Sequence, residues 1–182
     1  FYLHVNFGTP HPRYRVEEPW FSMYDRAAIR PWTHELPRNA PLHMRAMREI
    51  RTGLEIPDEV LREIQAVYYG MVSRVDSHIG RVLQAVEDEG LFEDSIVLFW
   101  VDHGDFAGMY GLPEKWDTSM ADCILHVPQI LWAPNLPDVR EVTSLTEHVD
   151  MAPTMLDLLG VEPDWGMHGQ SVLPILRGEE KK

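Results

Sequence analysis

Ser95-Ile96-Val97-Leu98-Phe99-Trp100-Val101 is a continuous apolar run that ends at Asp102-His103-Gly104-Asp105. β-Branched and aromatic residues dominate the run, which predicts a strand buried on both faces of a sheet. Open α/β sheets place their chemistry at strand ends. Asp102 offers a hard anionic oxygen and His103 an imidazole nitrogen, while Gly104 permits a sharp turn. The pattern therefore indicates either a metal site at Asp102 and His103 or a solvated turn after a core strand.

The composition limits the classes of protein and partner. With 182 residues, of which 45% are hydrophobic, the chain has the size and apolar content of one domain with a sizeable core. The formal net charge of −13 repels nucleic acid and anionic membranes, so we expect neither as a partner. No apolar run approaches the roughly 20 residues of a membrane span. The single cysteine, Cys123, excludes an intramolecular disulfide and leaves the compartment open.

Strands and helices are predicted to alternate along the chain. Strands are expected at residues 1–7, 95–101, 129–133 and 142–149, and helices at 21–25, 42–50, 56–89 and 151–159, the last capped by Asp150. Such alternation predicts an α/β fold with a mostly parallel sheet flanked by helices. The chain opens inside a strand pattern without a start methionine, so we expect further residues upstream.

Three further side chains deserve a chemical interpretation. His11 stands between Pro10 and Pro12, which restrict its backbone, and this suits either a ligand-contacting residue or an ordinary surface histidine. Lys115 follows a glycine-rich loop downstream of Asp102 and can reach an anion there, although a solvated lysine is the simpler alternative. Apolar neighbours of Cys123 favour a buried, inert thiol over a nucleophile.

Five stretches, taken together and in this order, resemble the sulfatase family of the alkaline phosphatase superfamily. They are residues 5–12, 68–76 with 79–81, 102–115, 149–154 and 169–174. The resemblance implies an alkaline phosphatase/sulfatase-like fold. It also implies that Asp102 and His103 are the second pair of ligands to a divalent metal, usually calcium. By the same resemblance, His11 and Lys115 contact the sulfate or help to protonate its leaving oxygen.

Two departures from the family pattern shape the expected function. The chain has neither the family's Asp-Asp metal pair nor the Cys-x-Pro-x-Arg or Ser-x-Pro-x-Arg segment that yields the formylglycine nucleophile. We therefore expect residues 1–182 to be the second half of a sulfatase-like catalytic domain, without the N-terminal half and the C-terminal subdomain. The expected activity is metal-dependent hydrolysis of a small-molecule or glycan sulfate monoester. A phosphonate or phosphate ester hydrolase of the same superfamily, or a non-catalytic sulfatase-like module, is the alternative.

Overall fold

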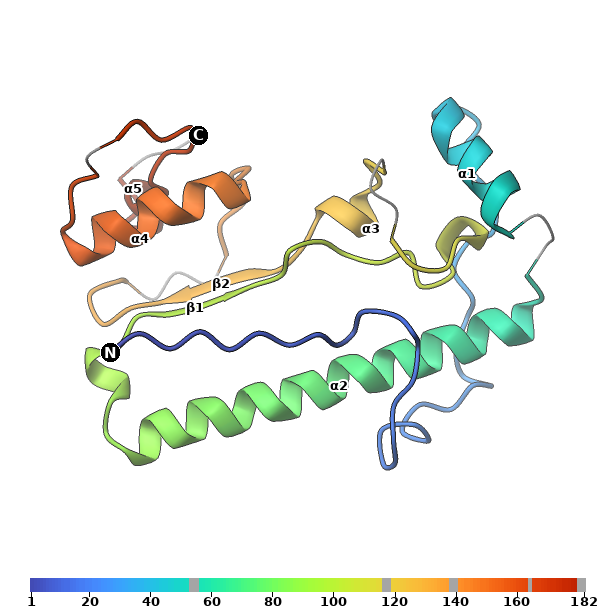
Figure 1. Cartoon of the computed structure of the whole chain (residues 1–182), viewed down its shortest axis with the longest axis horizontal. Helices are drawn as coiled ribbons and strands as arrows, with labels where there is room; N and C mark the ends of the chain where they lie inside the picture. The colour runs from blue at the N-terminus through green and yellow to red at the C-terminus, as the bar shows by residue number, and fades with distance from the viewer. Residues whose placement is uncertain (53–55, 116–118, 138–140, 164, 180–182) are drawn as a thin grey trace. The chain divides into compact units, whose positions relative to one another are not determined.

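A computed structural model describes residues 1–52, 56–115, 119–137, 141–163 and 165–179 (Figure 1). The helices are α1 (Leu42–Thr52), α2 (Asp58–Asp88), α3 (Asp122–Leu125), α4 (Met151–Leu159) and α5 (Leu173–Leu176), and the strands are β1 (Val97–Trp100) and β2 (Gln129–Trp132). Short 3-10 turns occupy Phe92–Asp94, Met109–Gly111 and His148–Asp150. The chain divides into two compact units, one of residues 1–91 and 103–128, the other of residues 92–102 and 129–182.

The long helix α2 confirms the periodicity of its sequence. Asp58 and Glu59 lie in its first turn, where carboxylates are favourable, and Gly90 ends it with a left-handed backbone at φ 66°. Only the first half of the helix is deeply buried. There Val67 and Met71 pack on Val16, which lies in the irregular segment that follows residue 11.

The segment of residues 1–7 differs from the buried strand that its alternation predicts. The segment runs alongside α2 (Figure 1). Phe1, Leu3, Val5 and Phe7 line a groove with residues of the second half of α2, and the Phe7 ring stacks on His78. However, no strand pairs with this segment within the described residues, and Phe1 is 88% exposed. A strand needs a hydrogen-bonded neighbour, and apolar alternation does not supply one.

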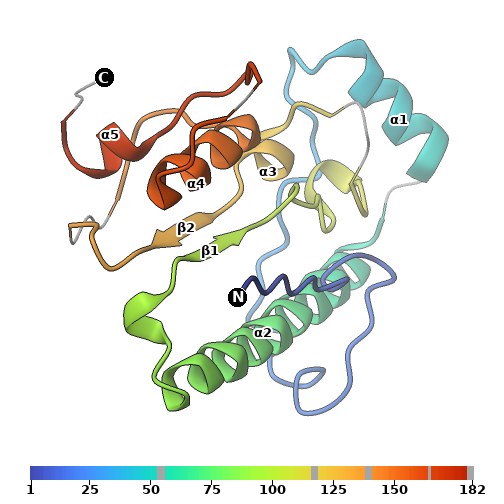
Figure 2. The same ribbon diagram turned by 60° about the vertical axis from the view of Figure 1, so that its left-hand side comes forward.

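The sheet that the described residues form has two strands, and these are antiparallel, whereas the sequence predicted a mostly parallel sheet. β1 and β2 lie side by side (Figure 2). Val97 pairs with Trp132 and Trp100 with Gln129. A parallel pair needs a crossover of a dozen or more residues, usually a helix. The described residues between β1 and β2 contain only the four-residue helix α3 and a 3-10 turn. β1 is also partly exposed along its length instead of buried on both faces.

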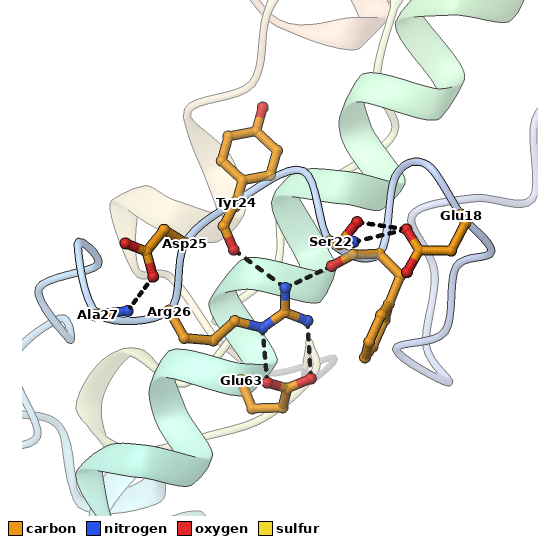
Figure 3. Close-up of polar contacts among 8 residues, drawn as sticks. Glu18, Ser22, Tyr24, Asp25, Arg26, Ala27 and Glu63 are labelled. Carbon is orange, nitrogen blue, oxygen red and sulfur yellow. Dashed lines mark hydrogen bonds and ion pairs between the residues drawn. The ribbon is translucent and has the colours of Figure 1, made fainter.

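Two further predictions were wrong because side chains compete with regular structure. Residues 21–25 form turns instead of a helix. The Arg26 guanidinium donates hydrogen bonds to the backbone carbonyls of Phe21 and Tyr24. The Glu18 carboxylate accepts hydrogen bonds from the backbone N–H and the hydroxyl of Ser22 (Figure 3). Residues 142–149 form no strand.

The start of α4 also differs from the predicted helix cap. Asp150 accepts hydrogen bonds from the backbone N–H groups of Glu147 and Gln170 and makes no side-chain cap to α4. The bond to Glu147 closes a 3-10 turn where the strand was expected. α4 itself has its predicted bounds, Met151–Leu159. None of the described helices combines the length and the apolar character needed to cross a membrane.

Candidate active site

The turn after β1 is held by a close backbone contact. Gly104 donates its N–H to the carbonyl of Ile124 at 2.8 Å, and a Cβ at this glycine would overlap the carbonyl oxygen of Cys123. Only glycine allows this approach between the turn and α3. The glycine in the Asp-His-Gly-Asp sequence therefore has a packing role that fixes the path of the chain after His103.

Asp102 and His103 are the expected metal ligands. The Asp102 side chain is exposed and His103 is half-buried. The Nδ1 atom of His103 lies 2.8 Å from the carbonyl oxygen of Gly104. Because a carbonyl oxygen only accepts hydrogen bonds, Nδ1 is the donor in this contact, and a bond of this kind orients the ring. Within the described ranges, no three His, Cys, Asp or Glu residues form a metal-binding group. Carboxylate and imidazole are groups that bind divalent ions, and the metal site at Asp102 and His103 stays a prediction.

His11 and Lys115 lie in the same unit, on two separate loops. His11 is exposed, its backbone N–H closes a turn to the carbonyl of Gly8, and its Nδ1 lies 2.6 Å from the carbonyl oxygen of Pro12. Lys115 is half-buried. The backbone N–H of its neighbour Glu114 is hydrogen-bonded to Tyr14, in the segment that follows His11.

A hydroxyl group links the loops that carry the expected site residues. Tyr14, three residues after His11, donates its hydroxyl to Oδ1 of Asp105 at 2.7 Å. The same hydroxyl oxygen accepts the backbone N–H of Glu114 at 2.6 Å. Asp105 Oδ1 also accepts the N–H of Ala107 at 2.7 Å. We call Tyr14, Asp105, Ala107 and Glu114 the Tyr14 network. It joins the segments of His11, His103 and Lys115, which lie far apart in the sequence.

Burial dominates the electrostatics of the Tyr14 network. Burial raises the pKa of the Asp105 carboxyl group, although the hydrogen bond from Tyr14 and the nearby charge of Lys115 lower it. Burial and the bond to Asp105 likewise raise the pKa of Tyr14, so its hydroxyl keeps its proton. The neighbouring Tyr68 ring meets Tyr14 edge-on at 6.2 Å between centroids, and burial raises its pKa to about 12. The Tyr14 network is therefore poorly solvated, and the charge of Lys115 acts on Asp105 more weakly than burial and the hydrogen bonds do.

The loop between Asp105 and Lys115 contains three non-glycine residues with left-handed backbones: Ala107 at φ 42°, Tyr110 at φ 58° and Glu114 at φ 68°. Each such residue costs roughly 1–2 kcal/mol, and strain of this kind is concentrated at functional sites. The backbone N–H of each of the three residues has a hydrogen-bond acceptor. Ala107 donates to Asp105 Oδ1, Tyr110 to the carbonyl of Thr33, and Glu114 to the Tyr14 hydroxyl. Contacts from other segments thus hold the loop in this strained form.

The sequence did not predict Tyr14 and Asp105 as parts of the site. Asp105 carries a local signal, because it is the fourth residue of the Asp-His-Gly-Asp turn. Tyr14 has none, since its partner lies 91 residues away. Burial raises the pKa of Cys123 to about 11, which agrees with the expected inert thiol.

Comparisons with known proteins place this geometry among related folds. The family model for sulfatases matches residues 1–161. Arylsulfatase K of Danio rerio is 27% identical over 97% of the chain and 36% of its own length. A phosphonate monoester hydrolase from Silicibacter pomeroyi superposes with a TM-score of 0.81 at 30% identity, over 94% of this chain and 36% of that one.

A putative sulfatase from Bacteroides thetaiotaomicron superposes with a TM-score of 0.67 at 25% identity, over 87% of this chain and 37% of that one. These similarities confirm the expected α/β fold of alkaline phosphatase and sulfatase type, of which the two-stranded sheet and its helices are a part. The chain spans about a third of the length of the relatives named here.

Proposed function

Because the chain belongs to the sulfatase family, we propose that it supplies part of the active site of a hydrolase that cleaves sulfate monoesters. Residues 1–182 would be the second half of the catalytic domain. The sequence has no Cys-x-Pro-x-Arg or Ser-x-Pro-x-Arg segment, so the formylglycine nucleophile is expected outside this chain. The family match over residues 1–161, and a coverage of 36% of the length of Arylsulfatase K of Danio rerio, support the interpretation that the chain is one part of a longer catalytic domain.

His11 and Lys115 are proposed to contact the sulfate. An ammonium group stabilises the negative charge that develops on the transferring group and the leaving oxygen. Lys115 is half-buried, and a charge has more effect there than in bulk water. The His11 ring, with Nδ1 directed at the Pro12 carbonyl, has Nε2 available to exchange a proton with a leaving oxygen.

Asp102 and His103 are proposed to bind the divalent metal, and calcium is the ion that the family favours. The hydrogen bond from His103 Nδ1 to the Gly104 carbonyl supports this role, because metal-binding histidines are commonly oriented by such a bond. Bound there, a divalent cation would supply charge stabilisation for the sulfate oxygens. Calcium prefers six to eight oxygen ligands, so most of its shell would come from other residues and water.

The observation that carries the proposal is the Tyr14 network. Two hydrogen bonds, of 2.7 and 2.6 Å, tie the segment after His11 to the turn after His103 and to the residue before Lys115. His11, His103 and Lys115 need such a link if they act on one sulfate, because their segments are far apart in the sequence. Three strained residues in one loop also support a functional site, because backbone strain is concentrated at such sites and not in ordinary solvated loops.

The test measures the full-length protein that carries this chain. We expect turnover of 4-nitrophenyl sulfate that is lost on metal chelation and restored by calcium. Lys115→Ala should lower kcat by on the order of 10² with a smaller effect on KM, and Lys115→Arg should recover part of the loss because it keeps the charge. An unchanged kcat in Lys115→Ala would assign this lysine to the solvated surface.

The alternatives give different outcomes in the same assay. Higher kcat/KM for 4-nitrophenyl phosphate or a phenylphosphonate monoester than for the sulfate would favour the phosphonate or phosphate hydrolase. Absence of turnover on all three esters, with calcium bound, would favour a non-catalytic module.

A further inference from the structure

A groove of about 560 Å³ lies beside the proposed sulfate site, within the first unit. It is lined by residues 12–16, Phe21, the first half of α2 and the pair Pro113 and Glu114. Its volume falls in the range of sites for small organic ligands. Pro12 follows His11 and Glu114 precedes Lys115, so the groove begins next to both residues that are proposed to contact sulfate.

The walls of the groove combine apolar surface with cations. Val16, Phe21, Ile64, Val67 and Pro113 provide an apolar wall of the kind on which a sugar or aryl ring packs. Arg13 and Arg15 also line it, and both are exposed. Neither arginine forms an ion pair with any carboxylate of the described residues.

The side chains that line the groove carry a net positive charge. Glu63 lines it, but Arg26 offsets that charge through two hydrogen bonds of 2.8 and 3.0 Å (Figure 3). Glu114 is the remaining carboxylate against Arg13 and Arg15, which leaves one net positive charge. In a chain with a net charge of −13, a positive groove selects anions locally while the rest of the surface repels them.

Arg26 also stabilises the shape of the apolar wall. Its guanidinium lies 4.5 Å from the centroid of the Phe21 ring and donates to the backbone carbonyls of Phe21 and Tyr24. These contacts fix the position of Phe21, which lines the groove. Because the wall is already ordered, less conformational entropy is lost when a ring binds to it.

We propose that this groove binds the leaving-group part of the substrate, and that this part carries a second anionic group, a carboxylate or another sulfate, which Arg13 and Arg15 bind. The proposal rests on the proposed function, since it takes sulfate to lie at His11 and Lys115. A guanidinium matches carboxylate and sulfate oxygens with paired N–H donors, so it suits this role better than a lysine.

The experiment compares two esters in the full-length protein: 4-methylumbelliferyl sulfate and the sulfate ester of 7-hydroxycoumarin-4-acetic acid, whose carboxylate lies far from the sulfate. The measured quantity is the ratio of kcat/KM for the carboxylated ester to kcat/KM for the plain ester. We expect Arg13→Gln and Arg15→Gln each to lower this ratio by about tenfold, mainly through KM. The matched control is Arg30→Gln, because Arg30 is exposed and does not line the groove, and it should leave the ratio unchanged.

A ratio that stays the same in both variants would overturn the proposal, as would equal kcat/KM of the wild type for the carboxylated ester and its neutral amide. If neither ester is hydrolysed, the proposed function fails and the groove is tested by calorimetry with 7-hydroxycoumarin-4-acetic acid. Binding that weakens about tenfold in Arg13→Gln and Arg15→Gln, but not in Arg30→Gln, would support the anion groove. Binding that is absent or equal in all variants would refute it.

Discussion

Replacing Tyr14 by Phe tests whether the Tyr14 network holds the loop that carries Lys115. The substitution keeps the ring and its edge-on contact with Tyr68, and it removes only the hydroxyl. That hydroxyl donates to Asp105 Oδ1 and accepts the N–H of Glu114. Two polar groups therefore lose a partner at once, while Asp105 keeps the N–H of Ala107.

The size of the effect follows from these two bonds. A hydrogen bond to a charged acceptor contributes about 1.5–3 kcal/mol, and leaving a buried N–H without a partner costs about 1–3 kcal/mol. Both bonds are partly buried, so water can replace part of the loss. We expect the loop of residues 106–115 to be destabilised by about 2–3 kcal/mol, which corresponds to roughly 30- to 150-fold faster exchange of its protected amide hydrogens.

Hydrogen exchange followed by mass spectrometry on the full-length protein measures this directly. Tyr14→Phe should lose protection in the peptide that contains Glu114, and kcat for the sulfate ester should fall with it because Lys115 is the next residue. Tyr68→Phe is the matched control, since its hydroxyl has no hydrogen bond among the described residues and its ring environment is similar. Equal protection in Tyr14→Phe and the wild type, or equal losses in the two variants, would refute the reasoning.

Three further predictions concern packing, thiol chemistry and metal binding. Gly70→Ala should destabilise the protein by about 1–3 kcal/mol in urea unfolding, because its Cβ would overlap the Trp20 carbonyl oxygen, whereas Gly80→Ala in the same helix has open space and should stabilise it by about 1 kcal/mol. Stabilisation by Gly70→Ala, or destabilisation by Gly80→Ala, would contradict this account of α2. Burial raises the pKa of Cys123 to about 11, so at pH 8 iodoacetamide should alkylate it about 100-fold more slowly in the folded than in the urea-unfolded protein. Similar rates would show an accessible thiolate. The 182-residue chain alone should bind calcium with a dissociation constant weaker than micromolar in calorimetry, since it offers two expected ligands, and tighter binding would mean that further ligands lie within it.

Elements with strong local signals were predicted correctly from the sequence. α2 has a regular apolar period, acids in its first turn and Gly90 beyond its end, and α4 ends before Gly160, whose backbone is also left-handed at φ 66°. These signals act within a few residues, so they depend little on distant contacts. The family resemblance likewise rested on short stretches, and the family match confirms it.

Features that depend on distant partners were not predictable in the same way. Residues 1–7 have the alternation of a strand, but strand formation depends on a neighbour that the pattern does not specify. The turns at 21–25 depend on Arg26, whose guanidinium bonds the carbonyls that a helix would need. The pairing of Tyr14 with Asp105 joins residues 91 positions apart, and no periodicity or motif marks it.

The loop before Lys115 shows why the site itself is hard to derive from sequence. Ala107, Tyr110 and Glu114 have left-handed backbones that disfavour non-glycine residues, so local propensity argues against the conformation that the loop adopts. Acceptors from Asp105, Thr33 and Tyr14 each bind one of these N–H groups, and their combined hydrogen bonds offset a strain of about 3–6 kcal/mol. The form of the loop therefore depends on the segments that bear these acceptors. It follows that the placement of Lys115 is a property of the tertiary structure, and substitutions at Tyr14 should affect catalysis without touching the substrate.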